Sequence, residues 1–146
     1  MAEEKIPGIM RDCFKAMEKG EVEKMLAFFT EDGVWVCPTG TFKGKEELRR
    51  YFTWMAQSMR DVKVTETGNG IIVQGNKAFV EHVIAGTMDD MRAEVLAMCA
   101  WEFSDGKVKE VRSTFDRLLM AKQAAKGWLA KWMVNMIVKQ SEKGLH

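Results

Sequence analysis

Three side chains in this chain could move protons or attack an electrophile, namely His82, Ser113 and Cys37. Histidine titrates near neutral pH and can act as a general base or a general acid. A serine hydroxyl can orient such a group or bind a substrate oxygen, and a cysteine becomes a nucleophile only when a nearby cation lowers its pKa. Facing one cavity, the three would provide proton-transfer chemistry.

Each of these residues also has a purely structural interpretation. His82 is equally compatible with a neutral core histidine that has one hydrogen-bond partner. Ser113 also fits a small residue bonded to the backbone, and Cys37 fits a buried, inert thiol. The chemical hypothesis therefore depends on whether the fold directs these side chains into one cavity.

Composition excludes several other classes of function. The 22 basic and 21 acidic residues give no basic excess of the kind that nucleic-acid binding uses, so we expect no nucleic-acid partner. No apolar run reaches about 18 residues, so we expect no membrane span. No spaced cluster of metal ligands, phosphate loop or dinucleotide motif is found, and we expect no metal and no cofactor. Three widely spaced cysteines and the lack of an apolar leader favour a reduced, cytoplasmic location.

The periodicity of apolar residues predicts the elements that would position the site. Helical spacing predicts helices over 9–19, 21–29 and 45–59, with a short strand at 34–37 between the second and the third. The period then changes to two at Val62, which predicts a meander: an alternating stretch that the glycines at 68–70 interrupt, then strands at 77–87, 92–103 and 107–116, with a turn at 88–90. A long helix is predicted over 117–139. This order indicates one α+β domain over residues 1–146, with 117–141 as an appended C-terminal helix.

Alternation along the strands predicts which side chains point inward. In 77–87, Val80, His82 and Ile84 share a face and Glu81 lies on the other; burying an unpaired carboxylate costs more than burying a neutral imidazole, so His82 is placed inside. In the last strand Ser113 shares the inner face with Phe115. The ligand-binding wall is then predicted to include Trp35, Trp54, Val80, Ile84 and Phe115, although such aromatic stripes also fit a plain core.

Three segments resemble the nuclear transport factor 2-like superfamily, in particular its SnoaL-like branch. They are AMEKGEVEKMLAFFTEDGVWVCP at 16–38, GTFKGKEELRRYF at 40–52 and WEFSDGKVKEVRSTFD at 101–116. The resemblance implies a curved antiparallel sheet wrapped around the N-terminal helices, a cone-shaped α+β barrel that leaves an apolar pocket. It also implies that the Trp101 face points inward, which adds Trp101 as the sixth residue of the predicted ligand-binding wall.

The residues that work in several relatives are not present here. The carboxylate that ketosteroid isomerase carries before its strand-ending proline corresponds to Cys37, and its tyrosine corresponds to Cys13. The Arg and Asp of the epoxide hydrolases correspond to His82 and Ile84, and their second Asp to Ser113. The resemblance therefore specifies the fold, and the superfamily hosts both enzymes and non-enzymes.

Two functional hypotheses follow. The first is a small-molecule enzyme of lyase, isomerase or cyclase type, which acts on an apolar carbonyl-bearing substrate with His82 as the proton carrier. The second is a non-catalytic apolar ligand-binding protein, or a dimeric interaction module, of the same fold.

We also expect a homodimer, because Leu96, Met98, Phe79 and Val83 form an apolar set on the outer face of the sheet. The amphipathic C-terminal helix is expected to pack on its own domain or on the second subunit rather than on a membrane surface.

Overall fold

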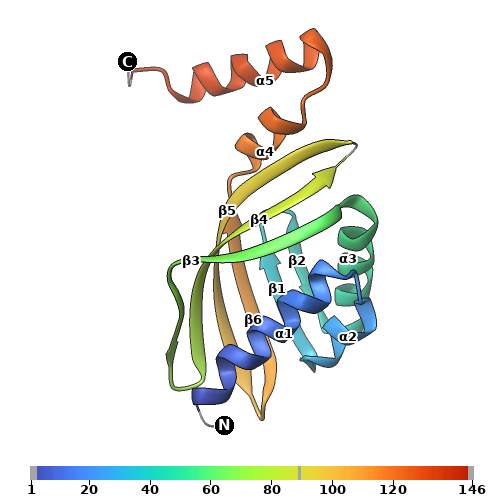
Figure 1. Cartoon of the computed structure of the whole chain (residues 1–146), viewed down its shortest axis with the longest axis vertical. Coiled ribbons are helices and arrows are strands. Elements are labelled where there is room, and N and C mark those ends of the chain that lie inside the picture. The colour runs from blue at the N-terminus through green and yellow to red at the C-terminus, as the bar shows by residue number, and fades with distance from the viewer. Residues whose placement is uncertain (1–2, 89, 145–146) are drawn as a thin grey trace.

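The computed structural model describes residues 3–88 and 90–144 and has the predicted α+β architecture (Figure 1). A short 3-10 helix η1 (Glu3–Lys5) precedes α1 (Ile6–Glu18), α2 (Val22–Ala27), β1 (Phe29–Cys37), β2 (Gly40–Lys43) and α3 (Gly44–Ser58). The long strands β3 (Arg60–Gln74), β4 (Lys77–Met88), β5 (Met91–Ser104) and β6 (Lys107–Phe115) follow, and α4 (Arg117–Ala124) and α5 (Gly127–Ser141) complete the chain.

One curved, unclosed sheet contains all six strands in the order β2-β1-β6-β5-β4-β3. Its neighbours are antiparallel except for β1 and β6, which are parallel. Helices α1 and α3 lie on the concave side, and α4 and α5 project beyond one end of the sheet (Figure 1).

The core lies between the concave face of the sheet and the N-terminal helices. Helix α1 has its apolar residues at helical spacing and buries Ile6, Met10, Cys13 and Phe14. The central strands contribute fully buried side chains on alternating positions, which is the pattern expected of strands with one dry face. This cluster comprises, among others, Phe29, Trp35, Phe52, Val80, Trp101 and Val111.

Two predicted boundaries differ from the structure, and a third falls partly outside the described residues. The second helix ends at Ala27, because Phe29 is fully buried as the first residue of β1. The glycines near 69 do not end a strand; β3 continues through them with a register shift between Glu66 and Ile71. Gly68 and Gly70 have positive φ angles there, as a β-bulge permits. The turn predicted at 88–90 includes Asp89, which lies outside the described residues.

The C-terminal helical segment is present but divided. Asp116 begins α4 by accepting a hydrogen bond from the Leu119 N–H at 2.9 Å. Ala125 and Lys126 then have extended backbone angles, and Gly127 has φ +73°. The extended Ala125 and Lys126 therefore end α4, and Gly127, the first residue of α5, adopts its left-handed conformation without steric cost as the chain enters that helix.

Lys45 joins three elements near the start of α3. Its Nζ donates to the carbonyl of Leu26 at 2.6 Å and to that of Phe29 at 2.9 Å. These carbonyls belong to the end of α2 and the start of β1, so a cation near the C-terminus of α2 satisfies groups that the helix cannot. This contact gives Lys45 a structural role within the 40–52 segment.

We expect Lys45→Met to lower the free energy of unfolding by about 1–3 kcal/mol, because two carbonyls lose a charge-assisted donor. The control is Lys43→Met, which removes a charge from an exposed side chain two residues away and should change stability by less than about 0.5 kcal/mol. Urea unfolding of both variants gives the comparison, and equal midpoints would contradict the assigned role of Lys45.

Candidate functional site

A cavity of about 640 Å³ lies between the concave face of the sheet and the helices α1 and α3. Exposed lining residues lie near the end of α3, at the start of β3 and in the first turn of α4, namely Trp54, Arg60, Asp61 and Arg117, which places the mouth there. The wall is mainly apolar and aromatic, with polar groups near the mouth. Its lining includes Phe14, Trp35, Tyr51, Met55, Ala97 and Phe115.

His82 is the one buried histidine among the described residues, and it lies in the wall of this cavity. Its side chain is 1% exposed, which confirms the inward direction predicted from strand alternation. The ring lies against Phe14 of α1, with 5.1 Å between centroids. The Nδ1 atom is buried and has no hydrogen-bond partner within the described chain.

Burial lowers the pKa of His82, since removal from water disfavours the charged imidazolium. The negative charge of Glu66 acts in the opposite direction but is the smaller effect. The imidazole is therefore neutral at pH 7 and has a lone pair that can accept a proton.

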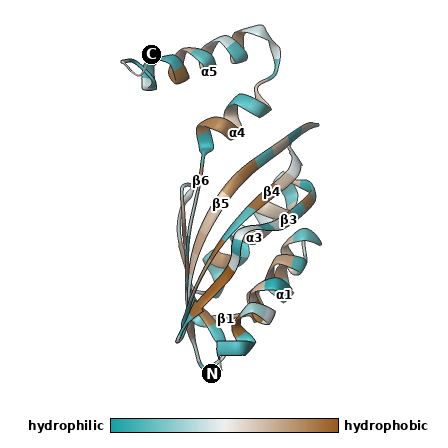
Figure 2. Ribbon diagram, turned by 60° about the vertical axis from the view of Figure 1, so that its left-hand side comes forward, coloured by the Kyte–Doolittle hydropathy of each residue, from teal (hydrophilic) through white to brown (hydrophobic). Residues whose placement is uncertain are grey.

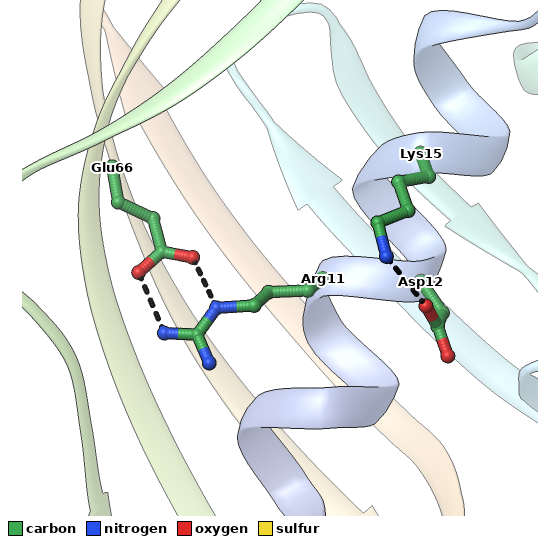
Figure 3. Close-up of polar contacts among 4 residues, drawn as sticks. All are labelled: Arg11, Asp12, Lys15 and Glu66. Atoms are coloured by element: carbon green, nitrogen blue, oxygen red, sulfur yellow. Dashed lines mark hydrogen bonds and ion pairs between the residues drawn. The ribbon is translucent and has the colours of Figure 1, made fainter.

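Glu66 lies directly opposite His82 on the neighbouring strand. Its carboxylate is engaged by the guanidinium of Arg11 on α1, through bonds of 2.7 and 3.0 Å (Figure 3). This paired hydrogen bond lowers the pKa of Glu66 and keeps the group ionised. Arg11 and Phe14 together place α1 over the rung of the sheet that contains His82.

Ser113 lines the cavity and is also part of the protein's own hydrogen-bond network. Its Oγ accepts from Trp35 Nε1 at 3.2 Å and donates to the Val36 carbonyl at 3.4 Å. The second distance is long for a hydroxyl donor, so that bond is weak. The hydroxyl proton can therefore turn toward a ligand oxygen while Trp35 keeps the serine in place.

Cys37 lies behind the wall rather than in it. Its Sγ is 3.1 Å from Thr39 Oγ1 and 3.5 Å from the Tyr51 hydroxyl. Burial, followed by the bond to Cys37, raises the pKa of Tyr51. This small network is internally satisfied, and no cation adjoins the thiol within the described hydrogen bonds and ion pairs.

The three candidate catalytic residues do not touch one another. His82 pairs with Ala97 on β5, whereas Ser113 pairs with Cys99 on the other edge of β5. Two strand spacings of about 4.8 Å separate β4 from β6, and the partners Ala97 and Cys99 lie two residues apart along β5, so the backbones of His82 and Ser113 are roughly 12 Å apart. Both side chains face the same cavity, which leaves space for a ligand between them.

Four of the six predicted wall residues line the cavity, namely Trp35, Trp54, Ile84 and Phe115. Val80 and Trp101 are buried in the core beside it, at 0% and 2% exposure. Ala97 and Cys99 of β5 occupy the stretch of wall between His82 and Ser113.

Sequence reasoning missed two groups of lining residues. Tyr51 and Met55 belong to the inward stripe of α3, and its helical spacing was a sufficient signal for both. The charged mouth residues Glu18, Arg60, Asp61 and Arg117 had no such signal, because they lie at the ends of elements whose spatial proximity only the fold creates.

The geometry defines a class of protein: an α+β cone with an apolar interior and one neutral imidazole in its wall. Residues 10–111 match the SnoaL-like domain family. The chain belongs to this family, which is part of the nuclear transport factor 2-like superfamily. A search of curated proteins finds no match for this chain.

Solved structures of the same fold are similar over most of the chain. A protein from Catenulispora acidiphila with a ketosteroid isomerase-like fold, in complex with trimethylamine, has a TM-score of 0.74 and 17% identity, covering 85% of this chain and 95% of that one. An NTF2-like protein from Burkholderia xenovorans gives 0.68 and 24%, covering 84% and 98%. An LEH-like epoxide hydrolase from M. tuberculosis gives 0.68 and 18%, covering 89% and 92%. At these identities the likeness shows the fold.

Two further observations concern residues 3–88 and 90–144. No three His, Cys, Asp or Glu side chains in these ranges converge as a metal site would require. No helix in them has the length and apolar character needed to cross a bilayer.

The lowered pKa of His82 predicts a specific dependence of stability on pH. Between the folded and unfolded pKa values, the unfolded chain binds more protons, so stability rises with pH. The contribution is complete above the unfolded value of about 6.5 and is lost as the pH falls toward the folded value. As the pH falls below about 6.5, the free energy of unfolding should therefore decline less steeply in His82→Gln than in the wild-type protein. Urea unfolding at several pH values tests this, and parallel curves for the two proteins would contradict it.

Proposed function

We propose that the chain is a small-molecule enzyme of lyase, isomerase or cyclase type that acts on an apolar carbonyl compound. The observation that carries the proposal is a single neutral, buried imidazole in the wall of a large apolar cavity. An apolar wall recognises an apolar substrate body by burial. A neutral imidazole in such a wall is suited to accept a proton from carbon next to a carbonyl group.

In the proposed reaction the substrate carbonyl oxygen lies at Ser113 and the acidic carbon faces His82. The imidazole accepts the proton, and the electrons of the C–H bond form an enolate whose charge rests on oxygen. The Ser113 hydroxyl, only weakly held by Val36 at 3.4 Å, donates to that oxygen. Return of the proton to another carbon gives an isomerase, and departure of a group from the next carbon gives a lyase.

Glu66 supports the charged state that forms during this transfer. Its carboxylate is on the strand position opposite His82 and stays ionised through Arg11. The imidazolium gains attraction from this charge only after it has accepted the proton. A fixed charge that attracts the reacting group more strongly in the transition state than in the ground state lowers the barrier.

Non-catalytic binding of an apolar ligand is the second candidate, and one observation favours it. Among the described residues that line the cavity, Ser113 and Trp35 already satisfy each other, and the carboxylates of Glu18 and Asp61 are at the mouth. Few polar groups in the interior are then available for chemistry. A protein that only stores or carries an apolar molecule requires no more than this.

Hydrogen–deuterium exchange separates the two candidates without knowledge of the natural substrate. A panel of apolar cyclic ketones is incubated with the full chain in D₂O, and loss of the signal from hydrogen next to the carbonyl is followed by NMR. We expect accelerated exchange for at least one ketone, and His82→Gln should reduce the rate by roughly 10²–10⁴. Ser113→Ala should reduce it by a smaller factor, of roughly 10–10².

Glu81→Gln is the matched control, because Glu81 is adjacent to His82 on the strand but on the outer face, where it accepts from Thr67. The Glu81→Gln variant should catalyse hydrogen exchange of the ketones at the wild-type rate. Quenching of Trp35 and Trp54 fluorescence reports binding independently. Ketones that bind without exchange above the buffer rate would replace the enzyme proposal with the binding one.

A further inference from the structure

The segment Arg117–Ser141, here called the arm, contacts its own domain through α4 only in part and leaves α5 largely uncovered. Gln123 of α4 exchanges two hydrogen bonds with the backbone of Glu94 on β5, at 2.7 and 2.8 Å. Helix α5 packs mainly against α4 and stands clear of the sheet (Figure 1). Packing on its own domain, one of the two expected arrangements, therefore holds for α4 and not for α5.

The exposed surface of α5 is unusually apolar. Trp128 is 80% exposed, and five more large apolar side chains are each about half exposed: Leu129, Trp132, Met133, Met136 and Ile137. At roughly 200 Å² for a large side chain, they expose roughly 700 Å² together. The largest apolar patch of an ordinary monomer is about 300–600 Å². Such a surface is typical of a helix that has a partner.

The pattern around α5 favours a protein partner over a lipid surface. Its polar residues Lys131, Asn135 and Lys139 recur at four-residue steps and form one narrow stripe. A helix that lies on a membrane has a broad, strongly charged face, whereas one that is apolar around most of its circumference is buried in protein. Its 15 residues span about 22 Å, short of the roughly 30 Å of a hydrocarbon core.

A second apolar surface on the same chain remains uncovered. The outer face of the sheet exposes Ile72, Phe79, Leu96 and Met98, at 51%, 41%, 46% and 38%. In Figure 2, α1 and α3 lie on one side of the sheet, and the C-terminal end of α5 projects past the sheet toward the opposite side. Both uncovered surfaces are thus available to a molecule placed against the outer face.

Size and charge both fit a second copy of this chain. The two surfaces together expose roughly 1,000 Å², and a stable interface needs about 800 Å² from each partner. The arm contains five basic residues and no acidic one, whereas the rest of the chain has 17 basic and 21 acidic residues. Two arms would repel each other, and each would be attracted to the other copy's body.

We infer that α5 packs against the body of a second copy in a two-fold dimer, so that each arm clasps the other subunit. Two-fold symmetry makes this contact reciprocal, so that both arms are buried at once. The arm also carries two mouth residues of the cavity, Arg117 and Met120, and Arg117 donates to the Pro38 carbonyl at 3.1 Å. Contact with the second copy thereby holds the mouth of each cavity in place.

The test compares substitutions on the two stripes of α5 by sedimentation velocity across a concentration series. Wild-type protein should sediment as a dimer of the 16.7 kDa chain. Met136→Glu, on the apolar stripe, should raise the dimer dissociation constant by roughly 10- to 100-fold. Asn135→Glu is the matched control, because it adds the same charge at the next residue but on the polar stripe, and it should leave the dissociation constant within about threefold of wild type.

Hydrogen exchange of the wild-type chain gives an independent result that does not rely on a variant's folding. Peptides from 128–141 should exchange more slowly above the dimer dissociation constant than below it. A wild-type monomer at micromolar concentration, or a dimer whose α5 exchange does not depend on concentration, would overturn the inference. So would a monomer that floats with vesicles of phosphatidylcholine and phosphatidylglycerol, which would assign the apolar stripe to lipid.

Discussion

The site and the two faces of the molecule depend on strict alternation along three long, paired strands. β4, β5 and β6 are hydrogen-bonded in continuous register from Lys77 to Met88, with one irregularity between β5 and β6 near Phe103. Every second side chain is therefore committed to the concave face, and a slip of one residue would exchange His82 for Glu81 in the core. The cost of burying an unpaired carboxylate is what makes this register the stable one.

The cavity exists because the covering helices fill only part of that concave face. Helix α1 is fixed over β3 and β4 by the Arg11–Glu66 pair and by Phe14 on His82, and α3 is fixed beside β1 by Lys45. Between them, β5 presents the small side chains of Ala93 and Ala97. Small residues opposite a gap leave space rather than a packed core, and an unfilled apolar space forfeits dispersion contacts. A ligand that occupies the cavity would recover them.

The proposed chemistry at this site depends on the surroundings of His82 rather than on contact between catalytic side chains. Burial keeps the His82 imidazole neutral, and the ionised Glu66 on the opposite strand favours its charged form once a proton arrives. Ser113 and Cys37 are both partners in local networks with Trp35 and Tyr51, and these networks position the aromatic wall. The thiols of Cys13 and Cys99, whose pKa burial raises to about 12, are inert parts of the same core.

Local sequence determined the α+β order, the inward face of each long strand and the burial of His82, because helical and strand periodicities follow from backbone geometry alone. It did not determine that β1 pairs in parallel with β6, that Gly68 and Gly70 form a bulge, or that the extended Ala125 and Lys126 separate α4 from α5. Those features depend on which segments meet in space. The same holds for the separation of His82 from Ser113 and for the mouth formed by Arg60, Asp61 and Arg117. Alternation tells which face a side chain takes, whereas strand order and sheet curvature set the distance between two side chains on that face, and only tertiary structure supplies these.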